Sequence, residues 1–488
     1  MRMKAESILI IGGSIAGLAC ALALKGKGFD VTILERDPAP SPDITPATSH
    51  RWKRNGTPHA VQPHTLIASI RNLLRDRYPD LLQELIDAGV GEHHFEDGFH
   101  KEIAGKYRPV SEDAEITTLM SRRTTLELVL RRYVERQAIA QLIVGAKVRS
   151  LLTEKQDDGT IVVRGVSIKD GEGCREIRSD VVIDASGRGS GFFQSLVQAG
   201  ADIREEYYAS NVAYFTRSYK LADGTTLPKA LIRVSQTPHM TMSLMSGDNG
   251  TATVTLAAFK DDPLLYGHLG DTEVFDAVIA SVPNIAEWIN PTHFLPTTGV
   301  NRWANMDATW RHSVSDGSPR LLGFFFAGDT ALRSNPKFGR GCACALIGSH
   351  ILADILVEQD SPRERAIRYE AGLKQAFRAE WEFLLTTDRN DYEAFRASVG
   401  LKPKSWRDRL RYIIGRQVNR AMQIDPEVRR AIVYAGNGIT DLTAWLKGPR
   451  IWLRILRSAF AGPIERRVIA RHETCVDRRA IAQMIQTV

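Results

Sequence analysis

The residues best suited to chemistry stand in two glycine-rich segments, one near the start of the chain and one past its middle. The first segment reads GGSIAG over residues 12–17 and follows the apolar run Ile8 to Ile11. An Ala/Leu-rich segment comes next, and then a second apolar run, Val31 to Leu34, which ends at Glu35. We interpret this order as strand, tight turn, helix and strand. Such a unit directs a helix N-terminus at an anion and a carboxylate at a ribose hydroxyl.

This first segment departs at one position from the G-x-G-x-x-G fingerprint of dinucleotide-binding proteins. Ser14 stands where the middle glycine is expected, and a fingerprint with one mismatch is a weak signal by itself. Serine is small enough to be accepted there, so we expect Ser14→Gly to leave nucleotide binding intact. The segment also approximates the G-x-S-x-G elbow of hydrolases. That serine follows several earlier strands and this one follows the first, so we do not assign Ser14 as a nucleophile.

The second segment follows Leu321 to Ala327, a continuous apolar run that predicts a strand buried on both faces. Gly328 and Asp329 end this run, and the turn PKFGRG at residues 336–341 leads into an apolar helix. A second helix N-terminus is thereby directed at something anionic, with the Asp329 carboxylate available for a sugar hydroxyl. Two such units suit a long ligand that carries a pyrophosphate and a reducible ring. FAD fits this description better than NADP.

Between these two segments, short alternating runs predict strands. Residues 147–151 and 161–166 are separated by Asp157-Asp158-Gly159, a hairpin signal. A third run, at 181–183, ends in another glycine-rich turn, which reads DASGRGS. Residues 205–300 alternate further, and we interpret them as a separate sheet inserted into the nucleotide domain. Beyond residue 360 the chain has a helical pattern.

The predicted fold class is therefore α/β, with a Rossmann-like FAD-binding domain, an inserted mainly β substrate domain and a helical C-terminal region. We place the three parts of the FAD-binding domain at residues 1–85, 121–200 and 306–360. The substrate domain takes residues 86–120 and 201–305, and the basic helical region takes 361–488.

Composition narrows the class of protein. The 488 residues are 43% hydrophobic and 25% charged, which is ordinary for a globular protein. We find no uncharged apolar run long enough to span a membrane and no signal peptide, and we expect a cytoplasmic location. The net charge of +7 is concentrated in residues 401–488, which hold 18 Lys/Arg and 7 Asp/Glu. The body has no basic stripe of its own, so no nucleic-acid partner is expected.

The histidines, the cysteines and Lys337 could also carry chemistry, but we assign them no metal, redox or catalytic role. The 12 histidines form no H-E-x-x-H or H-x-x-x-H pair, and the 5 cysteines form no C-x-x-C pair, so no metal site is predicted. We expect His64, His93 and His94 to be loop or packing residues. A redox pair at Cys342-x-Cys344 is disfavoured because both fall at the start of a buried helix. We expect Lys337 to be a solvent-facing position, with substrate binding as the alternative.

The C-terminal stretch RIWLRILRSAF, residues 450–460, has the pattern of a basic amphipathic helix. Trp452, Ile455, Leu456 and Ala459 fall on one side, with Phe460 at its flank and the arginines opposite. Such a helix can lie on an anionic membrane surface. We favour the simpler expectation that its apolar side packs on the body of the protein, with weak membrane-surface contact as the alternative.

Taken together, the motifs resemble those of the glutathione-reductase-type flavoproteins that include para-hydroxybenzoate hydroxylase, the flavin-dependent halogenases and the geranylgeranyl reductases. The strongest likeness is to the bacterial FAD monooxygenases of the polyether-epoxidase type. Their loop after the first acidic residue is similar to RNGTP at residues 54–58, with His64 and Leu66. The resemblance spans roughly residues 5 to 360 and does not cover the tail beyond about residue 400.

The resemblance implies FAD as cofactor. It implies that the first turn wraps the pyrophosphate, that Glu35 holds the adenosine ribose and that Arg123 reaches the phosphate and ribityl region. It also implies that Asp329 binds the pyrophosphate-ribityl segment and that residues 336–341 lie along the isoalloxazine edge. The predicted cofactor-binding residues are Gly12, Gly13, Ser14, Ala16, Gly17, Glu35, Arg36, Arg123, Asp184, Gly187, Gly328, Asp329, Pro336, Gly339 and Gly341.

The activity implied by the resemblance is that of a monooxygenase. Reduced flavin would react with O₂ to give a C4a-hydroperoxide, which hydroxylates or epoxidises a largely apolar small molecule. NADPH or NADH would supply electrons directly or through a flavin reductase, and no catalytic residue of the protein is assigned. A flavin-dependent halogenase is the alternative, although the 8 tryptophans include no Trp-x-Trp pair. A prenyl-chain reductase and a non-catalytic flavin-binding protein are further alternatives.

Overall fold

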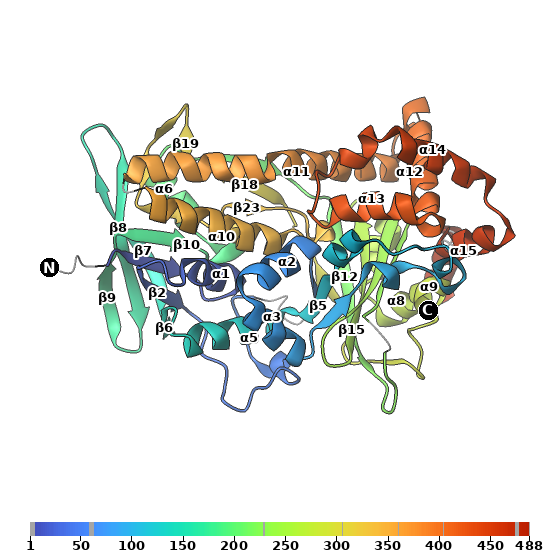
Figure 1. Cartoon of the computed structure of the whole chain (residues 1–488), viewed down its shortest axis with the longest axis horizontal. Helices are drawn as coiled ribbons and strands as arrows, with labels where there is room; N and C mark the ends of the chain where they lie inside the picture. Colours follow the sequence, from blue (N-terminus) through green and yellow to red (C-terminus); the bar gives the residue numbers. More distant parts are fainter. Residues whose placement is uncertain are drawn as a thin grey trace.

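One half of the molecule is built on a five-stranded parallel sheet (Figure 1). The computed structural model describes residues 5–57, 63–227, 230–304, 306–359, 361–403, 405–473 and 478–487. The strand order is β22-β10-β1-β2-β6, and every neighbouring pair is parallel. The strands are β1 (Ser7–Ile11), β2 (Asp30–Glu35), β6 (Gln141–Val144), β10 (Val181–Asp184) and β22 (Phe324–Phe326). Because the strands are parallel, their carboxyl ends lie along one edge.

Two apolar helices, α1 (Ile15–Leu24) and α10 (Gly341–Glu358), pack against each other beside this sheet. Helix α1 reads IAGLACALAL and is buried nearly all round, as its composition requires. The Cys20 Sγ of α1 lies 3.1 Å from the Ser349 Oγ of α10. Helix α10 is long and apolar enough to cross a membrane by length and composition, but 67% of it is buried inside the protein. It is a core helix packed beside the parallel sheet.

Further helices and a three-stranded sheet adjoin this layer. The helices are α2 (Ala68–Arg77), α3 (Pro79–Asp87), α4 (Lys101–Ala104), α5 (Arg123–Arg136) and α6 (Phe192–Ala199). The sheet has the order β3-β5-β4 and is formed by β3 (Pro63–Leu66), β4 (Gly91–His93) and β5 (Thr118–Arg122). Strand β5 leads directly into α5, so the backbone turns from sheet to helix between Arg122 and Arg123.

The predicted hairpin of residues 147–151 and 161–166 is confirmed, whereas the single strand predicted over residues 321–327 is wrong. Strands β7 (Lys147–Lys155), β8 (Ile161–Asp170) and β9 (Gly173–Arg178) form an antiparallel layer. The predicted strand 321–327 is two strands, because Gly323 has a φ of +69° and a side chain there would lie 2.6 Å from the Val163 carbonyl oxygen. Residues Leu321–Leu322 form β21 and pair with β8, whereas β22 joins the parallel sheet.

The other half of the molecule is built on an inserted antiparallel sheet with the order β13-β14-β15-β12-β16 and with β17 beside β12. Its strands are β12 (Val212–Leu221), β13 (Ile232–Gln236), β14 (Met240–Ser246), β15 (Thr251–Phe259), β16 (Phe294–Pro296) and β17 (Asn301–Trp303). One face packs apolar side chains such as Met242 and Val254 against α8 (Thr272–Ala280), with α7 (Pro263–His268) and α9 (Pro283–Ala286) nearby. The other face carries small polar residues, which alternate with the buried ones as strand geometry requires.

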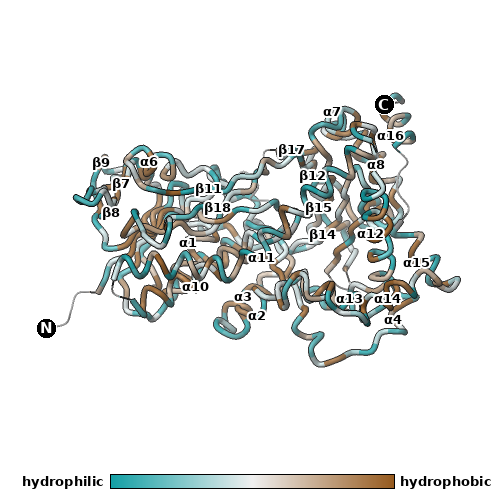
Figure 2. The backbone as a smooth tube through the Cα atoms, turned by 90° about the horizontal axis from the view of Figure 1, so that it is seen from above, coloured by the Kyte–Doolittle hydropathy of each residue, from teal (hydrophilic) through white to brown (hydrophobic). Residues whose placement is uncertain are grey.

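Paired strands and a buried ion pair are among the contacts that join the two halves. Strand β11 (Arg204–Tyr208) pairs with β18 (Ala308–His312), which pairs with β23 (Leu332–Arg333), and Figure 2 shows β11 and β18 running between the two halves. The buried ion pair is formed by Arg122 and Asp248. The Arg122 amide and Nε donate to the Asp248 carboxylate over 2.6 and 2.9 Å, so the turn between β14 and β15 is fixed to the start of α5. Short strands β19 (Val314–Ser315) and β20 (Ser318–Pro319) complete this region.

The C-terminal region is helical, as expected. Helix α11 (Pro362–Ser398) runs from the parallel sheet to the inserted sheet (Figure 1), and its buried Trp381 packs edge-on against Trp310 of β18. The remaining helices are α12 (Trp406–Ile424), α13 (Pro426–Gly436), α14 (Pro449–Arg457), α15 (Pro463–Glu473) and α16 (Arg478–Thr487). Ile481 of α16 enters the core of the inserted sheet, so the end of the described chain returns to the half of the molecule that contains this sheet.

Candidate functional site

The glycine motifs meet at the carboxyl edge of the parallel sheet. A side chain at Gly12 would lie 2.6 Å from the Ala185 carbonyl oxygen, which places the first motif against the turn after β10. A side chain at Gly328 would lie 2.6 Å from the Cβ of Ala16, which places the third motif against the first turn of α1. Segments some 300 residues apart in the sequence therefore form one surface. This is the edge at which open α/β sheets bind ligands.

The first turn needs its outer glycines for physical reasons. Gly12 has a φ of +104°, which side chains disfavour, and a side chain at Gly17 would lie 1.8 Å from the Gly12 carbonyl oxygen. The strand therefore passes into α1 with the helix N-terminus close beneath the turn. That cradle fits a pyrophosphate, because the first N–H groups of a helix and its dipole favour an anion.

Glu35 lies under this turn, where the sequence predicted it. Its Oε2 accepts hydrogen bonds from the Gly13 amide over 2.9 Å and from Arg54 Nη2 over 3.1 Å, and its Oε1 accepts from the Asp37 amide over 2.8 Å. Burial alone would raise the pKa of Glu35, but the charge of Arg54 and the two amide bonds outweigh it and lower the pKa. The carboxylate is therefore held ionised at the end of β2.

Arg54 is a site residue that the predicted set left out. Its buried guanidinium lies 3.1 Å from Glu35, 3.2 Å from Asp37 and 2.5 Å from Glu127. The ring of Trp52 covers it, with 4.7 Å between the guanidinium carbon and the ring centroid. The signal for Arg54 was available, because it begins the loop on which the family resemblance rests. By contrast, the predicted Arg36 is exposed and its guanidinium lies against Gly56 of the same loop.

Ser14 connects the first turn to α5. Its hydroxyl donates to Glu127 Oε2 over 2.6 Å and accepts from Arg123 Nη2 over 3.0 Å. Glu127 is only 1% exposed, and burial raises its pKa even though Arg54 and Arg123 oppose this. The sequence interpretation of Ser14 as a merely accepted replacement for glycine is incomplete, because its hydroxyl joins the predicted Arg123 to a buried carboxylate.

Asp184 is placed at the same edge, but its carboxylate is turned into its own loop. It accepts hydrogen bonds from the Ser186 amide over 3.0 Å and from the hydroxyls of Ser186 and Ser190 over 2.6 Å each. Burial raises its pKa. Its backbone carbonyl accepts from Thr330 Oγ1 over 2.5 Å, which links this turn to the third motif. Asp184 therefore shapes the edge. A cofactor contact through Asp184 or Gly187 stays a prediction.

The third motif stands over the N-terminus of α10. Asp329 lies in the turn Gly328–Thr330, and its Oδ1 would be 3.8 Å from a side chain at Gly341, the first residue of α10. The turn Pro336–Phe338 precedes Gly339, whose φ of +65° directs the chain back into the helix. A carboxylate and a helix N-terminus thus lie side by side, and their contact with the ring end of a cofactor stays a prediction.

The loop before α10, residues 334–340, is tied to both neighbouring layers through Asn335. Asn335 Oδ1 accepts from the hydroxyl of Tyr214 on β12 and from the Lys337 amide, and its Nδ2 donates to Asp388 of α11 over 3.0 Å. Burial raises the pKa of both Tyr214 and Asp388. The expectation for Lys337 is wrong, because its ammonium is part-buried and ion-paired with Asp391 of α11.

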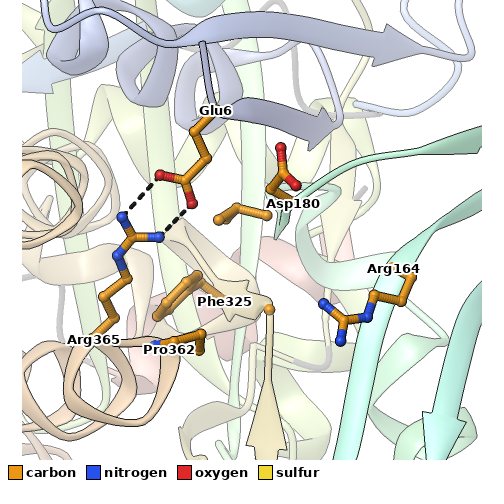
Figure 3. A pocket seen from close by; sticks show the side chains of 8 residues that line it. Glu6, Arg164, Asp180, Phe325, Pro362 and Arg365 are labelled. Carbon is orange, nitrogen blue, oxygen red and sulfur yellow. Dashed lines mark hydrogen bonds and ion pairs between the residues drawn. The ribbon is translucent and has the colours of Figure 1, made fainter. Parts of the chain in front are cut away.

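The cavity shown in Figure 3 lies elsewhere. Its volume is about 190 Å³, and it is lined by Glu6 just before β1, by Arg164 of β8, by the starts of β10 and β22 and by the first residues of α11. Glu6 and Arg365 form an ion pair across it. This cavity is at the amino ends of the parallel strands, whereas the glycine motifs are at the carboxyl ends, so the two lie at opposite edges of the sheet. We assign it no part in nucleotide binding.

Metal and thiol chemistry receive no support from the described residues. Within them, no group of three or more His, Cys, Asp or Glu side chains is arranged to hold a metal ion. His93 Nδ1 pairs with the Ala230 carbonyl oxygen at 2.9 Å, which is a packing role. Cys342 and Cys344 are free thiols, and burial raises the pKa of Cys342 to about 11. Such thiols stay protonated and react slowly.

Known proteins are similar to this chain in sequence or in fold. Residues 10–81 match the family described as NAD(P)-binding Rossmann-like domain. Protein Rv3254 of Mycobacterium tuberculosis (strain ATCC 25618 / H37Rv) is 26% identical over 356 residues, which cover 69% of this chain and 70% of that protein. Flavin-dependent brominase Bmp2 is 15% identical with a TM-score of 0.57, over 94% of this chain and 98% of Bmp2. p-Nitrophenol 4-monooxygenase PnpA from Pseudomonas putida DLL-E4 is 14% identical with a TM-score of 0.58, over 89% and 98% of the two chains.

Residues 10–81 are thus similar to a Rossmann-like NAD(P)-binding domain. As a whole it has the fold of the flavin-dependent monooxygenases and halogenases. The predicted α/β fold class and the resemblance to these flavoproteins are confirmed at the level of the fold. Because one fold supports several reactions, the activity has to be argued from the site.

Proposed function

We propose that the protein is an FAD-dependent monooxygenase that uses O₂ to hydroxylate or epoxidise a largely apolar small molecule. The observation that carries this proposal is the meeting of the first and third glycine motifs, with Gly328 against Ala16. The N-termini of α1 and α10 then bind one extended ligand that carries a negative charge at each end. FAD has this form, with a pyrophosphate and a ring that becomes anionic on reduction.

Different residues bind the pyrophosphate end and the ring end of FAD. At the pyrophosphate end, the turn at residues 12–17 supplies backbone donors, and Arg123 supplies positive charge from a position that Ser14 helps to hold. Glu35 would accept the ribose hydroxyls. At the ring end, Asp329 would bind the ribityl segment, and the N-terminus of α10 would stabilise negative charge on the reduced ring. Bound flavin supplies the redox and oxygen chemistry.

The substrate pocket is proposed between the inserted sheet and residues 336–341. Tyr214 reaches the loop before α10 through Asn335, so the face of β12 that carries Tyr214 is turned toward that loop. Thr216 is two residues further along the same strand, hence on the same face. Its hydroxyl is buried and has no hydrogen-bond partner. A buried, unpaired hydroxyl can orient one polar group of an otherwise apolar substrate.

A halogenase is the second candidate, because the flavin-dependent brominase Bmp2 shares the fold over nearly its whole length. The same flavin chemistry can oxidise a halide in place of an organic substrate. The electron donor is proposed to be NADPH or NADH, acting directly or through a flavin reductase. A prenyl-chain reductase would use the same site without O₂, and a flavin carrier would show no turnover.

One set of measurements on the purified full chain tests these functions. The protein should be yellow and release FAD on denaturation; a colourless protein that cannot be reconstituted with FAD would overturn the proposal. NAD(P)H oxidation, O₂ uptake and peroxide release are then followed with a panel of apolar aromatic and alkene substrates, with and without bromide. A monooxygenase couples O₂ uptake to an oxygenated product without halide. Bromide-dependent product would identify a halogenase, and O₂-independent NAD(P)H oxidation a reductase.

Thr216→Val is the matched variant for the substrate pocket, because it removes the hydroxyl and keeps the side-chain shape. FAD content should be unchanged, whereas KM for a substrate with a polar group should rise. Thr153→Val, at an exposed position of β7 in the other half of the molecule, serves as a control for the loss of a threonine hydroxyl. An unchanged KM in Thr216→Val would remove Thr216 from the proposed pocket and leave the flavin assignment intact.

A further inference from the structure

The C-terminal helices carry exposed apolar side chains that the nucleotide site does not use. On α12, Trp406 is 69% exposed, and Leu410 and Ile413 are also exposed. On α14 and the turn after it, Leu453 and Leu456 are exposed and Phe460 is 87% exposed. We call these six residues the C-terminal apolar face. Side chains of this size are rarely left in water in such a cluster without a partner.

The spacing of these residues puts Trp406, Leu410 and Ile413 on one side of α12 and Leu453 and Leu456 on one side of α14, and Phe460 lies in the turn Ser458–Phe460 that directly follows α14. Trp406, Leu410 and Ile413 follow one another at four and three residues, and Leu453, Leu456 and Phe460 at three and four. Three and four residues are the spacings of neighbours on a helix surface. Each set is therefore a continuous stripe rather than a scatter of single side chains.

The two stripes belong to one packed unit. Helices α12 and α14 contact each other, and Figure 1 shows them side by side. Gln417 Nε2 of α12 donates to the Ile455 carbonyl oxygen over 3.0 Å and to Ser458 Oγ over 2.6 Å. These bonds fix α12 against the end of α14, so both stripes are held on the same rigid part of the molecule.

The packing of α14 corrects the sequence expectation. Ile455 is buried against α12 and α13, as predicted for the apolar side of the helix. Leu456, predicted on that same side, is exposed together with Leu453 and Phe460. The body of the protein therefore satisfies only part of the apolar surface of α14. The remaining part is available to an external partner.

Basic residues accompany both stripes. Arg407, Arg409 and Arg411 are exposed on α12, and Arg450 and Arg457 are exposed on α14. Over residues 401–488 the chain holds 18 Lys/Arg and 7 Asp/Glu. A partner that covers both the apolar side chains and the arginines must present an apolar region with a layer of negative charge directly beside it. An anionic lipid bilayer has this arrangement, with acyl chains beneath phosphate groups.

We propose that the C-terminal apolar face binds the surface of an anionic membrane. The apolar side chains would enter the boundary between headgroups and acyl chains, Trp406 would sit at the interface that tryptophan prefers, and the arginines would extend to the lipid phosphates. A second copy of the chain fits less well. A two-fold contact would bring the arginine-rich stripes toward each other, and like charges across an interface are costly.

The proposal is tested on the full chain by co-sedimentation with vesicles. Wild-type protein should sediment with vesicles of equal parts phosphatidylcholine and phosphatidylglycerol, less with phosphatidylcholine alone, and less at high salt. The triple variant Trp406→Ser, Ile413→Ser, Phe460→Ser should lower the bound fraction about tenfold or more. A second variant, Arg407→Gln with Arg409→Gln and Arg411→Gln, should lose the preference for phosphatidylglycerol and keep weak binding.

Control variants and a second measurement keep the outcomes distinct. Val197→Ser and Val357→Ser remove exposed apolar side chains outside the C-terminal face and should not change sedimentation. All changed residues are exposed, so circular dichroism and Tm should match wild type. Absence of wild-type binding to anionic vesicles would overturn the proposal. So would light scattering that shows a stable dimer which only the triple serine variant dissociates, because the face would then be a contact between copies.

Discussion

The Ser14 hydroxyl donates a 2.6 Å hydrogen bond to the buried carboxylate of Glu127, a residue 113 positions later in the sequence. This bond joins the first glycine turn to α5. Through Glu127 the turn is also connected to Arg54, and through Ser14 itself to Arg123. The non-glycine residue of the fingerprint is therefore the point at which the nucleotide turn and its arginines are held together.

The role of Ser14 can be tested by removing its hydroxyl. Ser14→Ala and Ser14→Gly should weaken FAD binding about fivefold, because one hydrogen bond is lost and Arg123 is less well held. The fingerprint alone predicts no loss for Ser14→Gly, so this variant separates the two views. FAD dissociation constants from flavin fluorescence decide between them. Ser195→Ala, whose hydroxyl bonds only within its own helix, should bind FAD like wild type.

The glycines of the first turn should not accept even a methyl group. Gly17→Ala places its Cβ 1.8 Å from a backbone oxygen, and Gly12→Ala is strained by both its φ and its neighbours. We expect each variant to be purified without visible flavin absorption. Gly105→Ala is the matched control, because Gly105 has a helical φ of −64° and open space around it. Retention of FAD by Gly17→Ala would contradict the placement of the pyrophosphate.

The raised pKa of Glu127 predicts a pH dependence of stability. Because burial raises this pKa above its ordinary value of 4.5, the folded protein holds a proton that the unfolded chain releases. The contribution of Glu127 to the stability of the folded protein is fully present below pH 4.5 and is lost as the pH rises through the pKa that Glu127 has in the folded state. Glu127→Gln cannot titrate, so the Tm of wild type relative to this variant should fall as the pH rises above 4.5. Thermal unfolding of both proteins from acidic to neutral pH measures this difference. A wild-type Tm that instead rises relative to the Tm of Glu127→Gln as the pH increases would contradict the raised pKa. It would show that the charge of Arg54 outweighs burial.

The bond between Tyr214 and Asn335 should control the mobility of the loop before α10. Tyr214→Phe removes only the hydroxyl and leaves Asn335 Oδ1 with one donor fewer, at a cost of about 1 kcal/mol. Amide hydrogen exchange of residues 334–341 should then become several-fold faster, and exchange in α1 should be unchanged. Tyr412→Phe changes an exposed tyrosine of α12 and should leave the loop unaffected.

The ion pair between Arg122 and Asp248 should be the most sensitive contact between the halves. Asp248→Ala leaves the Arg122 charge buried and unpaired, which costs about 3–5 kcal/mol. Urea unfolding should show a lower midpoint, or a separate early transition of the inserted sheet. Asp276→Ala removes an exposed ion-pair partner of Arg217 in the same domain and should cost less than about 1 kcal/mol, because water reaches the Asp276 carboxylate. Equal losses in the two variants would contradict the assigned role of Asp248.

Local patterns in the sequence were sufficient to predict the elements at the start of the parallel sheet. The apolar run before Gly12, the glycine turn and the run that ends at Glu35 form β1, α1 and β2 as predicted. Such patterns are reliable because strand and helix periodicity and the special φ of glycine are properties of a few neighbouring residues. The split of the strand at Gly323 was missed, since it depends on the close approach of β8, which lies far away in the sequence.

By itself, the sequence determined the fold class, the order of the three motifs and the positions of the two glycine-rich turns. Only the tertiary structure decided that Ser14 contacts Glu127, that Arg54 is shared by three carboxylates, that Lys337 is ion-paired and that Leu456 and Phe460 stay exposed. The physical reason is that side-chain partners across a fold depend on how distant elements pack. No local pattern encodes that packing, whereas turn geometry and amphipathic spacing are encoded in each segment.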